Sequence, residues 1–313
     1  MKRLCLIALL LAFAPQAQAA DKLTVMLDWF VNPDHGPIIV AKQLGYFTDA
    51  GLDVDIIAPS DPSDPPKMVA AGKADLGVSY QPQLYLQHAA GLPLARVGTL
   101  IDSPLYCVLT RADGPVKTMA DLKGRKVGYS VPGIEEAILS GMLRHNGVQP
   151  SETTLINVNF SLVPALASGQ VDAVSGAFRN FEPHQLAAQG QAGTCFHPED
   201  NGVPAYDELI YEANPNTMDR DRVSRFLKAT ARAAATIEAD PNAGWAAFKS
   251  YAKDLDDPVN KQAWDDTISH YDAHPLSYDS ARYAAFGAFL KDAGLITEVP
   301  KPADIAVDLS QPQ

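Results

Sequence analysis

Short apolar runs alternate with amphipathic segments through the first hundred residues of the chain. The runs carry apolar residues in succession or at every second position, which is typical of β-strands, and the segments between them fit a helical period. Strands are predicted at residues 22–27, 53–58, 74–80 and 94–101, with helices at 37–44, 66–71 and 82–89. Strand and helix in turn, separated by short stretches with Gly and Pro, indicate an α/β unit.

The middle third of the chain repeats this pattern, with a strand before residue 130, a helix at 133–147, and a second strand and helix after it. The segments VAAGKADLGVS (69–79) and ALASGQVDAVSG (165–176) both join an apolar helix to a buried strand through a Gly and an Asp. Gly72 and Gly169 fit helix C-caps. Any helix-turn-strand junction can give this pattern; if the repeat is genuine, it predicts two similar α/β lobes.

Beyond residue 219 the pattern becomes helical, with apolar residues at three-to-four spacing in several segments. A strand at 208–213 is predicted to return the chain to the first lobe before these helices. The chain is then expected to cross between lobes near 110–113 and near 205–211. This assigns residues 21–111 and 208–313 to lobe 1 and residues 112–207 to lobe 2.

Residues 1–20 have a basic start, an apolar run and a small-residue end, and they are predicted to be a secretory signal peptide cleaved near Ala19 or Ala20. The apolar run of about eleven residues is shorter than the roughly twenty that span a bilayer. Without Lys2 and Arg3, 23 basic residues face 37 acidic ones. Such a net negative charge disfavours nucleic acid. We therefore expect a periplasmic protein that binds no nucleic acid.

Two cysteines, Cys107 and Cys195, remain in the mature chain. The apolar run LYCVLT (105–110) favours a buried strand thiol for Cys107. The periplasm permits disulfides, and the sequence leaves open whether the two cysteines are linked.

The sequence signatures of common nucleotide, zinc-protease and serine-hydrolase sites are absent: GxxxxGK[ST], GxGxxG, HExxH and GxSxG. His270 and His274 have the spacing of a two-His metal pair on a helix. Pro275 follows directly, however, and no third ligand is apparent. We therefore predict no catalytic residue, no metal site and no cofactor.

Three strand ends carry more aromatic and polar residues than turns require: DWFVNPDHG (28–36), VSYQ (78–81) and GAFRNFE (176–182). In parallel sheets such ends lie at one edge, so they are expected to converge on the cleft between the lobes. Aromatic side chains there can stack on a flat ligand. Glu182 can accept two hydrogen bonds from an amino group and a ring nitrogen. No role is assigned to His35.

A fourth segment, VGYSVPGIEE (127–136), joins a strand to a helix through a glycine-containing turn, as in sites that bind anions. Glu135 and Glu136 already place negative charge in the first helical turn, which disfavours a further anion. We therefore expect a neutral polar group of the ligand, rather than a phosphate, to meet Ser130 and Gly133.

These motifs resemble those of the periplasmic binding proteins that pass thiamin pyrimidine precursors to ABC transporters, and of the related yeast-type pyrimidine synthase. The likeness covers about residues 23–211. DWFVNPDHG and RNFE are similar to the aminopyrimidine subgroup, whereas AKQLGYFTDAGLDV is shared with nitrate, sulfonate and riboflavin binders. The resemblance implies a type II periplasmic binding protein fold, with two α/β lobes joined by a two-crossover hinge that closes on the ligand.

The resemblance further implies that Trp29 and Asn32 line the pocket on the first lobe, and that Glu182 holds the aminopyrimidine edge. With the strand-end analysis, the candidate ligand-binding residues are Trp29, Asn32, Tyr80, Tyr106, Ser130, Gly133, Phe178, Asn180 and Glu182.

The synthase branch of this resemblance uses a lysine to hold pyridoxal phosphate and a histidine as donor. Ser79 and Gln83 stand at those positions, so we do not expect an enzyme. The predicted function is that of a monomeric solute-binding component of an ABC importer, with a permease and its ATPase as partners. The expected ligand is a hydroxymethylpyrimidine or formylaminopyrimidine taken up for salvage. The alternatives are another flat nitrogenous ligand such as riboflavin, or a pyrimidine-synthase-like enzyme.

Overall fold

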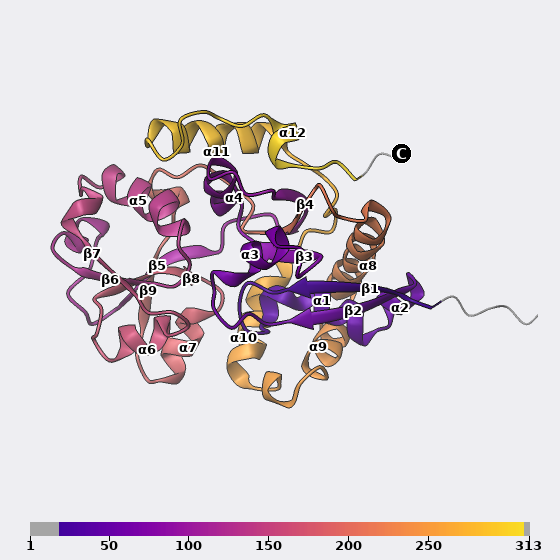
Figure 1. Ribbon diagram of the computed structural model, residues 1–313. Helices are drawn as coiled ribbons and strands as arrows, with labels where there is room; N and C mark the ends of the chain where they lie inside the picture. The colour runs from indigo at the N-terminus through magenta and orange to yellow at the C-terminus, as the bar shows by residue number, and fades with distance from the viewer. Residues whose placement is uncertain (1–18, 310–313) are drawn as a thin grey trace, which may run out of the picture.

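A computed structural model describes residues 19–309, and the signal peptide predicted for residues 1–20 lies almost entirely outside them. The chain forms two five-stranded sheets, seen at the right and the left of Figure 1. The first has the order β2-β1-β3-β10-β4 and the second the order β7-β6-β8-β5-β9. In both sheets the first three strands are parallel, and the fourth runs antiparallel to its neighbours.

The strands occur close to their predicted positions. The first sheet comprises β1 (Asp21–Met26), β2 (Leu52–Ile57), β3 (Leu76–Ser79), β4 (Ala95–Ile101) and β10 (Leu209–Ala213). The second comprises β5 (Tyr106–Arg111), β6 (Lys126–Tyr129), β7 (Thr154–Asn157), β8 (Ala173–Phe178) and β9 (Gly193–Phe196). Because β10 pairs with β3 and β4, the chain returns to the first sheet as predicted.

Helices cover both sheets (Figure 1). Those of the first lobe are α1 (Gly36–Gln43), α2 (Tyr46–Asp49), α3 (Asp64–Ala70), α4 (Gln81–Ala89), α8 (Arg220–Ala239), α9 (Pro241–Lys249), α10 (Pro258–Thr267), α11 (Ser280–Asp292) and α12 (Pro302–Ile305). Those of the second are α5 (Ser140–His145), α6 (Leu162–Ala167) and α7 (Glu182–Ala188). The helix predicted at 133–147 is divided, because a π-helix, η3 (Glu135–Leu139), precedes α5. In residues 19–309 no helix is both long and apolar enough to span a membrane.

The helix-to-strand junctions repeat in detail between the lobes. Gly72 and Gly169 both follow a helix with positive φ, 67° and 74°, which glycine adopts without strain. Asp75 accepts a hydrogen bond from the backbone N–H of Thr24, and Asp172 accepts one from that of Lys126. Asp75 thereby ties the start of β3 to β1, and Asp172 ties the start of β8 to β6.

The chain crosses between the sheets at residues 102–105 and again at 197–208. The first crossing precedes β5 and therefore lies earlier than the predicted 110–113. Residues 106–111 pair with β8 and β9 of the second sheet. An apolar strand next to a crossing fits either sheet by its pattern alone, since both sheets bury it.

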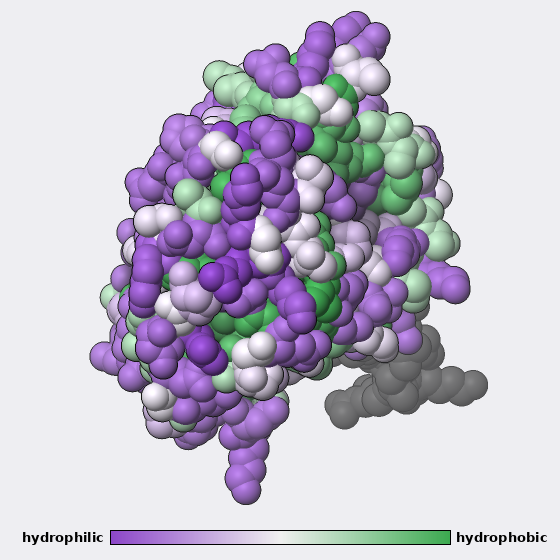
Figure 2. Space-filling model, turned by 90° about the vertical axis from the view of Figure 1, so that its left-hand side faces the viewer, coloured by the Kyte–Doolittle hydropathy of each residue, from purple (hydrophilic) through white to green (hydrophobic). Residues whose placement is uncertain are grey.

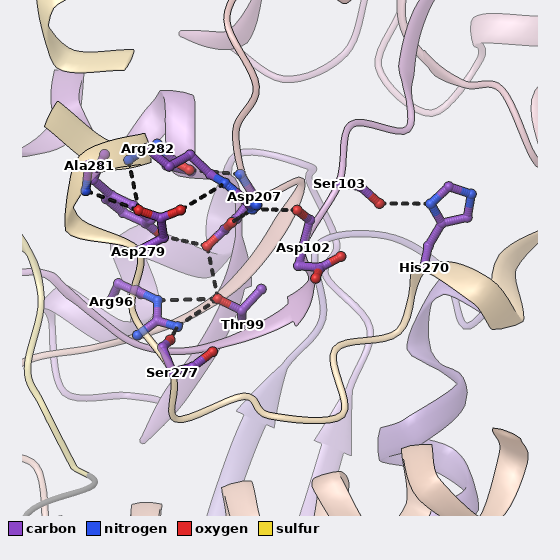
Figure 3. A network of polar contacts seen from close by, with 12 residues as sticks. Arg96, Thr99, Asp102, Ser103, Asp207, His270, Ser277, Asp279, Ala281 and Arg282 are labelled. Carbon is purple, nitrogen blue, oxygen red and sulfur yellow. Dashed lines mark hydrogen bonds and ion pairs between the residues drawn. The ribbon is translucent and has the colours of Figure 1, made fainter. Parts of the chain in front are cut away.

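Adjacent carboxylates in the second crossing fix the hinge on two sides. Asp207 accepts hydrogen bonds from Thr99 of β4 and from Arg282 of α11, at 2.9 and 2.6 Å (Figure 3). Arg282 also donates to the backbone carbonyl of Asp102 in the first crossing. Glu208 accepts from the backbone N–H groups of Leu105 and Tyr106, at 2.6 and 2.8 Å. These hydrogen bonds join the two crossings to each other and to β4 and α11.

Cys107 lies in β5 and is fully buried, as predicted, but it is not a free thiol, because it is joined to Cys195 of β9. The two strands are antiparallel neighbours, with Leu109 opposite Cys195, and the Cα atoms of the cysteines are 5.4 Å apart. The two cysteines are 88 residues apart in the sequence, and the pairing of β5 with β9 brings them together.

We predict that the stability of the protein falls as the pH rises from about 5 to about 8. Burial raises the pKa of Glu212 on β10 to about 8, although the hydroxyl of Ser79 opposes this. The folded chain then keeps a proton that the unfolded chain releases near pH 4.5. Each such group lowers the free energy of unfolding by up to about 1.4 kcal/mol per pH unit in this window, and its stabilising effect is lost above about pH 8.

Thermal unfolding between pH 4.5 and 8.5 measures this dependence. Glu212→Gln is expected to flatten it, because an amide carries no proton to lose, while the exposed Glu238→Gln on α8 serves as the control. A slope that is equal in wild type and Glu212→Gln would contradict the assignment.

Candidate functional site

A cavity lies between the two lobes, where strand ends of both sheets meet. The first lobe contributes Asp28, Trp29, Asn32, Asp34 and Tyr80, and the second contributes Tyr106, Ser130, Val131, Ile134, Glu135, Leu162, Gly176, Phe178, Phe181 and Glu182. The empty space among these side chains, with its opening to solvent, is about 480 Å³, yet the centre of a water-sized sphere can reach only about 30 Å³ of it. That is room for roughly two waters. The lobes are closed, and we expect them to part before a heterocycle can enter.

Seven of the nine candidate residues line this cavity: Trp29, Asn32, Tyr80, Tyr106, Ser130, Phe178 and Glu182. Gly133 is outside the lining; it has φ 97° and its N–H donates to Glu136. Asn180 is also outside, because its amide nitrogen donates to Asp34 at 2.7 Å and to Thr267 of α10 at 2.6 Å. Asn180 thereby links the second lobe to the first behind the cavity.

Sequence reasoning did not select three carboxyl side chains of the lining, Asp28, Asp34 and Glu135. Asp28 and Asp34 lie within the stretch DWFVNPDHG, so their position at the strand end was the available signal. Glu135 was interpreted only as a first-turn charge.

Asp28 organises the first-lobe wall. One of its oxygens accepts a hydrogen bond from the Tyr80 hydroxyl at 2.7 Å, and the other lies 2.8 Å from Nε2 of His35. Nδ1 of His35 accepts a hydrogen bond from the backbone N–H of Asn32 at 3.3 Å. Nε2 therefore carries the ring proton and donates a hydrogen bond to Asp28. His35 is fully buried. Its role is thus to hold Asp28 and the turn, behind the cavity wall.

Glu182 of the second lobe and Asp34 of the first line the cavity, and both have raised pKa values. Glu182, at the first position of α7, accepts a hydrogen bond from the backbone N–H of Phe178 at 2.7 Å, and burial raises its pKa to about 7. Burial also raises the pKa of Asp34 to about 7, although the hydrogen bond from Asn180 opposes this. Both groups are poised to exchange a proton with a ligand near neutral pH.

Aromatic side chains form the remaining walls and join the lobes at the rim. The Trp29 and Phe160 ring centroids are 4.7 Å apart, and those of Phe30 and Phe160 are 4.4 Å apart. Tyr80 and Phe178 meet edge to face at 6.4 Å. Phe30 remains 53% exposed at this rim. Each aromatic pair of this kind contributes roughly 1 kcal/mol beyond its burial.

The cavity is acidic. Four carboxyl side chains line it, and among the described lining residues there is no Lys, Arg or His. In Figure 2, which turns the second lobe toward the viewer, hydrophilic residues cover most of the outer face, and hydrophobic residues show in smaller patches among them. A planar ligand that donates hydrogen bonds or carries positive charge suits the cavity, whereas an anionic one would lack a counter-charge.

The positions compared with the synthase lysine and histidine lie beside the cavity. The Ser79 hydroxyl donates to the side-chain oxygen of Gln83 at 3.2 Å. The amide nitrogen of Gln83 donates to the carbonyl of Pro132 in the second lobe at 2.8 Å. Both residues are therefore occupied in structural contacts.

His270 and His274 do not form the helical pair that their spacing allows. The 3-10 helix that contains His270 ends there, and its ring contacts Ser103 at 2.8 Å. In the described chain, no group of three or more His, Cys, Asp or Glu side chains is arranged to hold a metal ion.

Comparison with known sequences identifies proteins related to this chain. Residues 32–244 match the family model described as NMT1/THI5 like. A Haemophilus influenzae protein described as a thiamine biosynthesis protein is 49% identical over 292 residues, 93% of each chain. The formylaminopyrimidine-binding protein of Halalkalibacterium halodurans is 38% identical over 224 residues, 68% of each chain. A 4-amino-5-hydroxymethyl-2-methylpyrimidine phosphate synthase of Saccharomyces cerevisiae is 26% identical over 270 residues, 81% of this chain and 78% of the enzyme.

Comparison with solved structures concerns the fold. The periplasmic aliphatic sulphonate binding protein SsuA from Escherichia coli aligns with a TM-score of 0.69 over 94% of both chains, at 18% sequence identity. The predicted type II periplasmic binding protein fold, with two α/β lobes, is therefore confirmed.

Proposed function

This chain belongs to the NMT1/THI5-like family, and from that premise we propose that it is the solute-binding component of an ABC importer for a thiamin-related aminopyrimidine. The observation that carries the proposal is the cavity between the lobes, which combines aromatic walls with four carboxyl groups and no basic side chain among its described lining residues. An aminopyrimidine is flat, and it offers an amino group beside a ring nitrogen.

In this proposal the ring stacks against Trp29 and the aromatic residues opposite it. Glu182 accepts a hydrogen bond from the exocyclic amino group and shares a proton with the neighbouring ring nitrogen. A carboxyl group with a pKa of about 7 suits this role, because it can supply or accept that proton near neutral pH. Asn32 and Tyr80 supply further polar contacts on the first lobe, with Tyr106 and Ser130 on the second.

Closure of the lobes then carries the signal to the transporter. Ligand contacts on both lobes favour the closed state only to the extent that they are stronger there than in the open state. The membrane permease and its ATPase are the proposed partners. A periplasmic location, reached through the predicted signal peptide, is part of the same proposal.

The residues of the cavity do not fit the cofactor chemistry of the synthase relatives. Pyridoxal phosphate needs an amine for its Schiff base and positive groups for its phosphate. The described lining residues offer neither, and Ser79 stands at the position compared with the lysine. This supports binding without turnover.

Native mass spectrometry of the purified mature protein, followed by calorimetry after the ligand has been removed, tests the proposal. We expect 4-amino-5-hydroxymethyl-2-methylpyrimidine or its formylamino counterpart to bind one to one and to be recovered with unchanged mass after incubation. Tighter binding of riboflavin, or chemical conversion of the pyrimidine, would overturn it.

A further inference from the structure

One carboxyl group of the cavity bonds to no other side chain in the closed protein. Asp28 is held by Tyr80 and His35, and Glu182 by the backbone of Phe178. Glu135 is 2% exposed and lines the cavity, yet no side chain among the described residues bonds to its carboxyl oxygens, and only the nearby backbone N–H groups of Glu135 itself and Val131 offset its burial. A buried carboxyl without a side-chain partner is costly, so its retention inside a ligand cavity calls for a partner that the protein itself does not supply.

The local backbone explains how Glu135 comes to face the cavity. It begins the π-helix η3, and short π-helical segments are found frequently at functional sites. The neighbouring Glu136 is exposed and accepts the N–H of Gly133, so Glu136 caps this turn from the surface. Opposite Glu135 lies Gly176, where a methyl group in place of hydrogen would come within 3.8 Å of a Glu135 oxygen. That is an ordinary van der Waals distance, and it is the positive φ of 85° at Gly176 that favours glycine there.

The surroundings of Glu135 are acidic or neutral. Glu136 follows it on the same element, and Tyr106 of β5 is the titratable group that faces it from the neighbouring strand. Burial and the nearby Glu136 raise the pKa of Glu135 well above its usual value. The carboxyl stands at the start of a helix, where backbone N–H groups would otherwise attract an anion, and a phosphate there would meet a second acidic group in place of a cation.

We propose that Glu135 determines specificity by binding a hydrogen-bond-donating substituent of the ligand, of the amino or amide class, and by excluding a phosphate ester at that position. This rests on the proposed function, since the ring itself is assigned to Glu182 and the aromatic walls. A phosphate would meet an acidic group without a cation nearby. An N–H group would provide the partner that Glu135 lacks.

Calorimetry with three 4-amino-2-methylpyrimidines tests the proposal, with methyl, aminomethyl or phosphorylated hydroxymethyl as the 5-substituent. We expect wild type to prefer the aminomethyl ligand to the methyl ligand by at least tenfold and to bind the phosphate ester weakest. Glu135→Gln is expected to reduce that preference to threefold or less and to tighten binding of the phosphate ester. The methyl ligand should bind equally to both proteins. Glu136→Gln, which makes the same change one residue away at the surface, is the matched control and should retain the wild-type order.

The outcomes separate the two proposals. If wild type binds the methyl ligand but Glu135→Gln leaves the substituent preference unchanged, or weakens all three ligands equally, the role of Glu135 is overturned while the proposed function stands. If none of the three ligands binds wild type, the proposed function fails, and the role of Glu135 fails with it. Thermal unfolding without ligand gives an independent check, because Glu135→Gln should unfold at the same temperature or higher.

Discussion

Replacing Glu182 by glutamine is expected to weaken aminopyrimidine binding at least a hundredfold. The carboxyl group can accept from the amino group and share a proton with the ring nitrogen, whereas an amide would present an N–H group to one of them. Hydrogen bonds to charged groups contribute about 1.5–3 kcal/mol each, and a hundredfold change in dissociation constant corresponds to about 2.7 kcal/mol. The loss of one such interaction, with a mismatched donor in its place, accounts for this magnitude.

The fold should tolerate this substitution. Glutamine keeps an oxygen that can accept the backbone N–H of Phe178, so the start of α7 remains held. Glu182 is also protonated in a large fraction of ligand-free molecules near pH 7, because burial raises its pKa to about 7. A neutral side chain there is therefore already compatible with the closed packing.

Isothermal titration calorimetry on protein freed of bound ligand measures the effect. Glu152→Gln is the control, since Glu152 is a carboxylate of the same lobe that pairs with Lys123 at the surface. A change of less than threefold for Glu182→Gln would show that the cavity does not bind the ring through this residue. A tenfold loss for Glu152→Gln would instead indicate a general effect of charge.

Local patterns predicted most of the fold. The strands follow runs of apolar residues, and the junctions at Gly72 and Gly169 were visible because capping and strand opening depend on a few neighbouring residues. The first crossing was placed too late because residues 106–111 are apolar and buried in either lobe. Which sheet they join depends on pairing with β8 and β9, and this long-range pairing leaves no periodic signal in β5 itself.

Local sequence patterns also predicted some residues of the cavity and missed others. Trp29, Tyr80 and Glu182 lie within four residues of a strand end, so strand ends and the family resemblance both indicated them. Glu135 was missed because two adjacent glutamates at a helix start look alike in the sequence. Only the π-helical turn decides that Glu135 points into the cavity while Glu136 caps Gly133 at the surface. The charge of the site thus depended on a backbone detail that composition does not reveal.

Reducing the bond between Cys107 and Cys195 is expected to lower the free energy of unfolding by about 4 kcal/mol. The bond closes a loop of 88 residues, and the chain-entropy model assigns about 4.6 kcal/mol to a loop of that length, a value that native strain or residual structure reduces. It also fixes the edge strand β9 to β5. Because β5 and β8 carry Tyr106, Phe178 and the turn to Glu182, the disulfide supports the second-lobe wall of the cavity as well as the fold.

Urea unfolding of the mature protein with and without dithiothreitol measures this difference. Substituting both cysteines by serine should give the lower stability in either buffer and remove the sensitivity to the reductant. Alkylation under denaturing conditions should label neither cysteine before reduction and both after it. Two reactive thiols in the unreduced protein, or an unchanged urea midpoint on reduction, would contradict the bond. Because β9 is bonded only to β5 within the second sheet, we expect the reduced protein to lose order first at this edge, with ligand affinity falling before the first lobe unfolds.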